Sequence, residues 1–233
     1  MRTVILAGGP GTRIRPLSIG EPKLLMRVAG KRIIDMLFAQ LLRFDYTDIT
    51  ITTHYLRDEI VRYVQEHWWQ LDVQFPEEPQ PLGTAGSVKN AHINDQMLVI
   101  QGDAVMDGVD LPAMVAYHNT HSGGATIGLK RVEDASEYGA VDCNELGRVV
   151  CFQEKARNPE FHVVNTGIYV LEPWVMQYVP DDRPFDFARD LFPVLIDRGE
   201  LYAYEFKSGF WIDVGTPEGF YAALDYLNTA HYQ

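Results

Sequence analysis

A glycine-rich segment that directly follows a short apolar run places the strongest constraint on this chain. Val4-Ile5-Leu6 is typical of a buried strand, and the residues that follow are Ala7-Gly8-Gly9-Pro10-Gly11-Thr12-Arg13. Glycines at this spacing let the backbone turn sharply, or let a ligand approach its N–H groups. Arg13, Arg15 and Lys23 come next in a chain with a formal net charge of -12. Exposed N–H groups beside a few placed cations suit a polyphosphate, which is the ligand that we predict here.

The overall composition limits the class of protein. Within 233 residues the acidic balance argues against a nonspecific nucleic-acid binder, because such a protein needs a basic surface. No stretch reaches the ~18 consecutive apolar residues of a membrane span, and the N-terminal apolar run meets glycine too early for a secretion signal. Cys143 and Cys151 lack the spacing of a metal site or a redox motif. We therefore expect a cytoplasmic protein with free thiols, no nucleic-acid partner and no membrane partner.

The first hundred residues alternate between strand and helix patterns. This alternation predicts a mainly parallel sheet with right-handed crossovers. Ligands of such sheets gather at the carboxyl ends of the strands, where both the glycine segment and Asp103 are expected. The expected strands are 4–6, 48–53, 73–75 and 97–101, and the expected helices are 33–42, 60–68 and 84–93.

The second half mixes hairpins with helices. We expect helices over 112–120 and 187–198, strands over 125–131 and 162–171, and a final helix capped by Thr216-Pro217. One hairpin is predicted from 140–142 and 149–154, and a second from 201–206 and 210–213. No linker or repeat interrupts the chain. We predict a single Rossmann-like α/β domain over 1–233, with a nucleotide-binding half (1–110) and a second-substrate half (111–233).

Two common nucleotide motifs do not fit the glycine segment. The Gly-Lys-Ser/Thr ending of a P-loop is missing, and Ile14 stands where a dinucleotide fingerprint needs glycine. If the glycines are considered alone, they could also form a tight turn that binds no ligand. The added Thr12-Arg13, Arg15-Pro16-Leu17 and Pro22-Lys23 favour a ligand site.

The whole pattern, Gly-Gly-x-Gly-Thr-Arg-x-Arg-Pro-Leu followed by Pro-Lys, resembles the signature of the sugar-1-phosphate nucleotidyltransferases. Further segments resemble that family's motifs and occur in the family's order: 78–86, Gly102-Asp103, Glu137-Tyr138-Gly139, Phe152-Gln153-Glu154-Lys155, 165–169 and 211–217. Each segment alone is a weak signal. Together they cover nearly the whole chain and identify it as a member of the family.

The resemblance implies a reaction in which a phosphate oxygen of a sugar 1-phosphate attacks the α-phosphorus of a nucleoside triphosphate and releases pyrophosphate. A phosphate monoester, with a second pKa of about 6, is already largely dianionic near neutral pH. It therefore needs no general base. The protein must instead align two anions and neutralise the developing charge, which agrees with a sequence that shows no Ser-His-Asp or Cys-His arrangement.

The resemblance also implies a role for particular residues. The catalytic residues would be Arg13, Lys23, Asp103 and Lys155, and Asp103 and Asp213 would bind Mg²⁺. Nucleotide binding would fall to Leu6, Gly8, Gly9, Gly11, Thr12, Arg13, Lys23, Glu78, Gly83 and Thr84. The sugar phosphate would contact Tyr138, Gly139, Glu154, Lys155, Asn165 and Thr166.

Structural alternatives remain beside these roles. Asp103 could cap a turn, Asp213 could be a satisfied buried polar residue, and Lys155 could be a solvated hairpin residue. For Arg15 we weight two interpretations equally, a contact with phosphate and a structural salt bridge. For His118 and His121 we favour a solvated helix end over a metal site, and for Trp68-Trp69 a packing role.

The substrate is less constrained than the reaction. Residues 81–86 look most like the guanylyltransferases that act on mannose 1-phosphate, with thymidylyl and uridylyl transfer to glucose 1-phosphate as the alternative. The chain ends just after its last expected helix, so the C-terminal β-helix of many relatives is not expected. A non-catalytic nucleotide-sugar sensor and a glycosyltransferase stay open as other classes, although Asp103 and Asp107 are poorly spaced for the latter. A homo-oligomer is left open as well.

Overall fold

The computed structural model describes residues 1–9, 11–14, 17–18, 20–156 and 160–230. Arg15, whose role the sequence leaves open, lies outside these ranges. Among the described residues, no helix is both long and apolar enough to cross a membrane.

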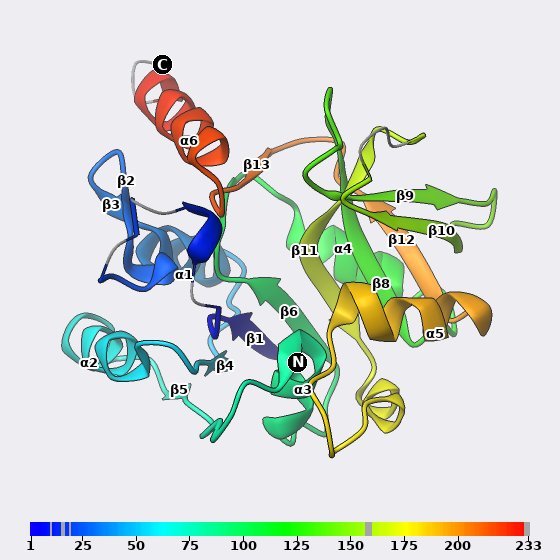
Figure 1. Cartoon of the computed structure of the whole chain (residues 1–233), viewed down its shortest axis with the longest axis horizontal. Coiled ribbons are helices and arrows are strands. Elements are labelled where there is room, and N and C mark those ends of the chain that lie inside the picture. Colours follow the sequence, from blue (N-terminus) through cyan, green and yellow to red (C-terminus); the bar gives the residue numbers. More distant parts are fainter. Residues whose placement is uncertain (10, 15–16, 19, 157–159, 231–233) are drawn as a thin grey trace.

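A nine-stranded mixed sheet forms the centre of the molecule (Figure 1). Its first half is parallel, in the order β6-β1-β4-β5, with β1 in register so that Ile5 lies beside both Ile51 and Ile100. The bounds of these strands are β1 Arg2–Leu6, β4 Ile49–Thr52, β5 Val73–Gln74 and β6 Met97–Gln101. The four expected strands are therefore confirmed, and their carboxyl ends lie at one edge of the sheet.

Helices cover both faces of this sheet. Side chains alternate between the two faces of a strand, so that Val4 packs against one set of helices and its neighbour Ile5 against the other. The face of Val4 is covered by α3 (Gly83–Asn90) and α5 (Phe192–Asp197). The face of Ile5 is covered by α1 (Ile33–Leu42), α2 (Arg57–His67), α4 (Leu111–His118) and α6 (Pro217–Ala230).

The second half of the chain extends the sheet with antiparallel strands. Its β11 (Val163–Leu171) runs antiparallel to β6 and also pairs with β8 (Ala125–Arg131). The expected hairpin of β9 (Gly139–Cys143) and β10 (Val149–Glu154) is confirmed, and Figure 1 shows it on the side of the molecule away from α2.

The second predicted hairpin is wrong. Instead, β12 (Leu201–Glu205) pairs in parallel with β8, whereas β13 (Phe210–Asp213) pairs antiparallel with β7 (Ala104–Asp107). Gly209, at φ +77°, lets the chain leave β12 and pass close to the backbone of Gly108. The strand pairing brings Asp213 beside Ala104, and therefore next to Asp103.

Several shorter elements were not expected from the sequence. They are the small strands β2 (Arg27–Val28) and β3 (Lys31–Arg32), 3₁₀ turns at Thr12–Ile14, Lys23–Leu25 and Pro173–Tyr178, and β7 itself. The predicted helix over 187–198 begins as a π-helical turn, Phe187–Leu191, before α5. The predicted cap of the last helix is confirmed, since the Gly219 N–H donates to Thr216 Oγ1 over 3.2 Å.

The two histidines at the end of α4 do not form a solvated cap, contrary to the expectation. His118 is only 1% exposed, with Nδ1 2.8 Å from Thr126 Oγ1 and Nε2 3.2 Å from Glu172 Oε1. His121 stacks on Tyr202 with the ring centres 3.7 Å apart. Packing of the helix end against β8 and β12 buries the ring of His118 and partly buries that of His121. The expected packing is confirmed for Trp68, which packs on Phe38, whereas Trp69 is exposed.

Candidate active site

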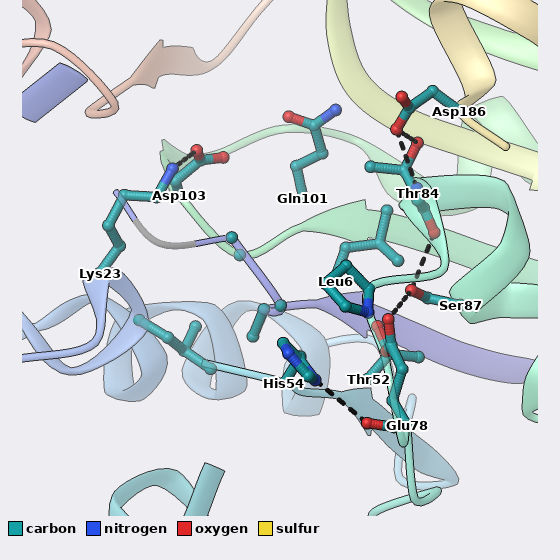
Figure 2. A pocket seen from close by; sticks show the side chains of 17 residues that line it. Leu6, Lys23, Thr52, His54, Glu78, Thr84, Ser87, Gln101, Asp103 and Asp186 are labelled. Carbon is teal, nitrogen blue, oxygen red and sulfur yellow. Dashed lines mark hydrogen bonds and ion pairs between the residues drawn. The ribbon is translucent and has the colours of Figure 1, made fainter. Parts of the chain in front are cut away.

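The first of two adjoining cavities, about 320 Å³ in volume, lies at the carboxyl ends of β1, β4 and β6. This is where the strand order predicts a ligand. Figure 2 shows the ion pair of Lys23 with Asp103 on one side and the bond between Thr84 and Asp186 on the other, with Gln101 between them. The cavity gathers these predicted residues from the first half of the chain: Leu6, Gly8, Gly9, Lys23, Glu78, Gly83, Thr84 and Asp103.

Gly11 and Thr12, two described residues of the glycine segment, line neither cavity. Thr12 is exposed. Gly11 has φ +62°, accepts a hydrogen bond from Ser18 Oγ at 3.1 Å, and would place a Cβ 2.9 Å from Cγ of Lys23. Its observed role is to let the Lys23 side chain pass close to the backbone, and its contact with a phosphate stays a prediction.

A second cavity of about 440 Å³ adjoins the first. The two share a wall made of Thr84, Gln101, Asp103 and Asp186. The second cavity gathers Arg13, Asp213 and all the residues predicted for the sugar phosphate: Tyr138, Gly139, Glu154, Lys155, Asn165 and Thr166. The structure thus places the residues predicted for the sugar phosphate in one space and most of those predicted for the nucleotide in its neighbour. Arg13, which was predicted for the nucleotide, lies with the sugar-phosphate residues instead.

Opposite charges are paired across the shared wall. The Lys23 ammonium bonds to Asp103 Oδ2, and Arg13 lies 3.9 Å from Asp213 Oδ2. Burial raises the pKa of Asp213 to about 6, and the neighbouring Asp103 carboxylate adds to this rise. Burial also acts to raise the pKa of Asp103, but the Lys23 charge and hydrogen bond outweigh it and lower that pKa.

The two aspartates suit a divalent cation. The Val214 N–H donates to the Asp103 carbonyl at 2.8 Å, which joins the ends of the two segments that carry them. A Cβ on Gly215 would lie 2.7 Å from Asp213 Oδ1 and 3.4 Å from Asp103 Oδ2, so both carboxylates border the same space. Oxygen donors of this kind suit Mg²⁺. Within the described part of the chain, no group of three or more His, Cys, Asp or Glu side chains is placed to hold a metal.

Lys155 has an unusual backbone conformation at the mouth of the second cavity. Its φ is +49°, which non-glycine residues adopt rarely. Its N–H donates to the Tyr138 carbonyl at 2.9 Å, and its ammonium lies 3.9 Å from Glu154 Oε1. Strained residues of this kind cluster at functional sites. Lys155 lines the cavity, but its side chain is 43% exposed, so its contact with a sugar phosphate stays a prediction.

The other predicted polar residues of the second cavity are held by hydrogen bonds within the protein. Asn165 accepts from the Gly167 N–H at 2.8 Å and donates to the Tyr169 hydroxyl at 3.1 Å. The Thr166 hydroxyl donates to the Gly128 carbonyl at 2.8 Å and is buried. Asn165 therefore presents a fixed amide to the cavity, whereas the Thr166 hydroxyl supports the sheet.

Sequence reasoning missed several residues that line the cavities: Thr52, His54, Ser87, Gln101, Asp186 and Arg189. The place of Gln101 could have been inferred, because it directly precedes Gly102-Asp103 at the end of a strand. Asp186 and Arg189 carry no recognisable motif. They reach the site because Thr84, from a distant part of the chain, bonds to Asp186 Oδ1.

An α/β sheet with adjoining cavities at its strand ends, one bordered by a glycine loop and both by acidic strand ends, defines a nucleotide-handling protein. A sequence model of the Nucleotidyl transferase family matches residues 2–229. The chain belongs to this family, which confirms the resemblance.

Curated proteins similar to this chain include several sugar-phosphate nucleotidyltransferases. The chain is 32% identical to a mannose-1-phosphate guanylyltransferase of Mycobacterium tuberculosis, over 93% of this chain and 62% of that protein. It is 30% identical to the mannose-1-phosphate guanylyltransferase catalytic subunit beta of Dictyostelium discoideum, over 98% of this chain and 65% of that protein. It is also 32% identical to a UTP–glucose-1-phosphate uridylyltransferase of Synechocystis, over 96% of this chain and 62% of that protein. The chain thus spans less than two thirds of the length of these relatives.

A solved structure agrees in fold over nearly the whole length of both chains. It is a crystal structure from Bacillus anthracis, in complex with sucrose, assigned as a glucose-1-phosphate thymidylyltransferase. The TM-score is 0.84 at 26% identity, and the match covers 97% of this chain and 94% of that chain. The predicted α/β fold with a mainly parallel central sheet is therefore confirmed.

Proposed function

We propose that this chain joins a sugar 1-phosphate to a nucleoside triphosphate, and that GTP and mannose 1-phosphate are its preferred substrates. One observation carries the reaction. Two cavities, the first lined by Lys23 and the second by Arg13, Lys155 and Arg189, share a wall that contains Asp103. Two anionic substrates could meet at that wall, and family membership and the curated relatives support the same reaction.

The residues divide the work of holding two anions that repel each other. Lys23 and Arg13 bind the triphosphate, and Lys155 holds the phosphate of the sugar. Because the attacking phosphate is already dianionic, alignment and charge neutralisation provide the catalysis. Asp103 and Asp213 would hold Mg²⁺, which when bound supplies positive charge to the phosphate oxygens.

The preference for guanine rests on Glu78. Its Oε1 accepts hydrogen bonds from the Leu82 N–H at 3.1 Å and from Ser87 Oγ at 2.9 Å, which fixes the carboxylate on the wall of the first cavity. A carboxylate only accepts hydrogen bonds. Guanine offers two adjacent donors, N1–H and N2–H₂, whereas uracil and thymine offer one donor between two acceptors. A fixed carboxylate therefore favours guanine.

The compartment is part of the proposal. Cys143 and Cys151 are both free thiols in the structure, and free cysteines are usual in a reducing compartment. We infer that the protein works in the cytoplasm.

A substrate panel tests the proposal. Pyrophosphate release would be measured with GTP, UTP and dTTP, each paired with mannose 1-phosphate and glucose 1-phosphate, in the presence of Mg²⁺. We expect the highest kcat/KM with GTP and mannose 1-phosphate. Glu78→Gln, which adds a donor at the same place, should narrow the preference for GTP over UTP. A UTP or dTTP preference would overturn the guanine assignment, and binding without turnover would indicate a sensor.

A further inference from the structure

The segment that follows Phe185 joins the two cavities through one carboxylate. Asp186 lines both cavities. Its Oδ1 accepts from the Thr84 N–H at 3.0 Å and from the Thr84 hydroxyl at 3.3 Å, while its Oδ2 pairs with the guanidinium of Arg189. Arg189 belongs to the second cavity. A single side chain therefore connects the first turn of α3, at the nucleotide cavity, to a cation in the neighbouring cavity.

The backbone around Asp186 is held firmly to the same turn. The Phe185 carbonyl accepts from the N–H groups of Ala85 at 2.9 Å and Gly86 at 3.0 Å, and the Phe185 N–H donates to the Leu82 carbonyl at 2.8 Å. The Phe187 N–H donates to Thr84 Oγ1 at 2.9 Å. Figure 2 shows Asp186, Thr84, Ser87 and Glu78 following one another along the cavity wall. The position of Asp186 is thus fixed by the segment that also holds Glu78.

The π-helical turn Phe187–Leu191 places Arg189 at the second cavity. Single π turns within helices occur frequently at functional sites. The Asp186 N–H bonds to Asp190 Oδ2 at 2.8 Å, which closes this turn on itself. Arg189 is also near enough to Glu154, a predicted sugar ligand, for the two charges to interact and raise the pKa of Arg189, a rise that comes chiefly from Asp186.

The pairing of Arg189 with Asp186 is easily exchanged for a ligand. The Arg189 side chain is 74% exposed, and an ion pair so open to water contributes little to stability. A dianionic phosphate offers a guanidinium two oxygens and a higher charge than one carboxylate. Five carboxylates line the second cavity: Asp103, Glu137, Glu154, Asp186 and Asp213. A phosphate bound there would therefore need another cation in addition to Lys155.

We propose that Arg189 is a further binding residue for the phosphate of the second substrate, and that Asp186 is a positioning residue that aligns it with the nucleotide cavity. This inference rests on the proposed function, because the second ligand is taken to be a sugar 1-phosphate. In the free protein Asp186 holds Arg189 at the shared wall. When the sugar phosphate binds, the guanidinium turns from Asp186 to the phosphate, and Asp186 keeps its bonds to Thr84.

The test separates the two substrates. Arg189→Gln should raise the KM for mannose 1-phosphate about 10- to 100-fold and change the KM for GTP by no more than about twofold. Arg189→Lys keeps the positive charge but loses the paired N–H donors of the guanidinium. Its KM for mannose 1-phosphate should therefore lie between those of the wild type and Arg189→Gln. Arg198→Gln is the matched control, because Arg198 is also an exposed arginine paired with a carboxylate, Glu200 at 3.3 Å, and lines neither cavity.

Asp186 gives an independent readout. Asp186→Asn keeps an oxygen for Thr84 and releases the charge on Arg189, so the KM for the sugar phosphate should stay level or fall. Asp186→Ala loses the Thr84 contacts as well and should raise the KM for GTP. Equal effects of Arg189→Gln and Arg198→Gln, or a rise confined to the KM for GTP, would overturn the inference.

Calorimetric titration of mannose 1-phosphate keeps this test separate from the proposed function. If the wild-type protein binds the ligand without turnover, the proposed function fails, and weaker binding by Arg189→Gln still supports the role of Arg189. If binding is equal in the wild type and Arg189→Gln, the role of Arg189 is overturned whatever the turnover. If the wild type binds no mannose 1-phosphate and does not turn it over, both proposals are overturned.

Discussion

The ammonium of Lys23 bonds to the carboxylate of Asp103 on the wall that the two cavities share. The side chains of Lys23 and Asp103 are only 18% and 14% exposed. Lys23 follows the glycine segment in the sequence, and Asp103 follows β6. In the free protein this cation neutralises a carboxylate that would otherwise face Asp213 across the same space. Binding of a triphosphate and a divalent ion would give each of the two groups a new partner.

Replacing Lys23 with methionine should remove most of the activity. The proposed function assigns this cation to the triphosphate, and loss of one placed group that stabilises developing charge costs ~10²- to 10³-fold in kcat. Steady-state pyrophosphate release would measure it. Lys207→Met is the control, because Lys207 is an exposed lysine that pairs with Glu205 at 2.6 Å. Near wild-type kcat in Lys23→Met would contradict the assigned role.

Replacing Asp213 with asparagine should stabilise the fold while it removes activity. Burial and Asp103 raise the pKa of Asp213 from 3.8 to about 6. Between these pH values the folded protein binds more protons than the unfolded chain, so this group makes stability fall as pH rises from about 4 to about 6. Asp213→Asn, measured by thermal unfolding with EDTA, should therefore have a higher Tm than the wild type at pH 8, with the difference shrinking toward pH 4.

Asp103→Asn should behave in the opposite way and serves as the control for Asp213→Asn. The pKa of Asp103 is lowered by Lys23 despite its burial, so the charged form stabilises the fold. Its removal leaves a partly buried ammonium without its partner, and the Tm should fall. We expect the Asp213 carboxylate to destabilise the fold and the Asp103 carboxylate to stabilise it. A shift of the Tm in the same direction in both variants would contradict this expectation.

Local sequence patterns predicted the first half of this fold well. Val4-Ile5-Leu6, the alternating residues 49–52 and the apolar residues 97–101 are buried strands because each lies between helices on both faces. Strands that are buried on both faces are usually rich in apolar residues, although in 49–52 two threonines are buried beside the isoleucines. The ligand edge followed from the order of strand and helix alone.

Long-range pairing was not predictable in the same way. The short run Phe210–Asp213 follows the strand at 201–206 closely enough for a hairpin, but it pairs instead with β7, more than 100 positions earlier in the chain. Nothing in this short run specifies that partner. Asp213 was nevertheless identified through its motif. Arg189 had no motif. The helix predicted over 187–198 contains it, but this helix begins as a π-helical turn, and the contact of Arg189 with the site passes through Asp186 and Thr84.

Replacing Gly83 with alanine should disturb nucleotide binding and stability together. Gly83 has φ +75°, and a Cβ there would lie 2.7 Å from both N and O of Phe185. The backbone of Phe185 cannot move without breaking its bonds to Ala85 and Gly86. We expect a loss of ~2–4 kcal/mol in the free energy of unfolding and a higher KM for GTP. Gly30→Ala separates the two causes, because φ there is +80° but nothing lies within 4 Å of the added Cβ; an equal loss in both variants would rule out the close contact.

The stacked ring of His121 should make the protein sensitive to mild acid. Burial, together with the neighbouring His118, lowers the pKa of His121 from 6.5 to about 4. The folded protein therefore holds this ring neutral while the unfolded chain protonates it, so the stability present above pH 6.5 is lost progressively as pH falls toward 4. His121→Phe keeps a ring to stack on Tyr202 and removes the titration.

Thermal unfolding at pH 7 and pH 5 would measure this effect. The variant should have a lower Tm at pH 7, because it loses the contact of Nε2 with Thr126 Oγ1 at 3.0 Å. Its Tm should then fall less between pH 7 and pH 5 than that of the wild type. His67→Phe is the control, since His67 also stacks on a tyrosine, Tyr63, with 4.1 Å between ring centres, but at the surface. If His67→Phe and His121→Phe flatten the pH dependence equally, burial of His121 is not its cause.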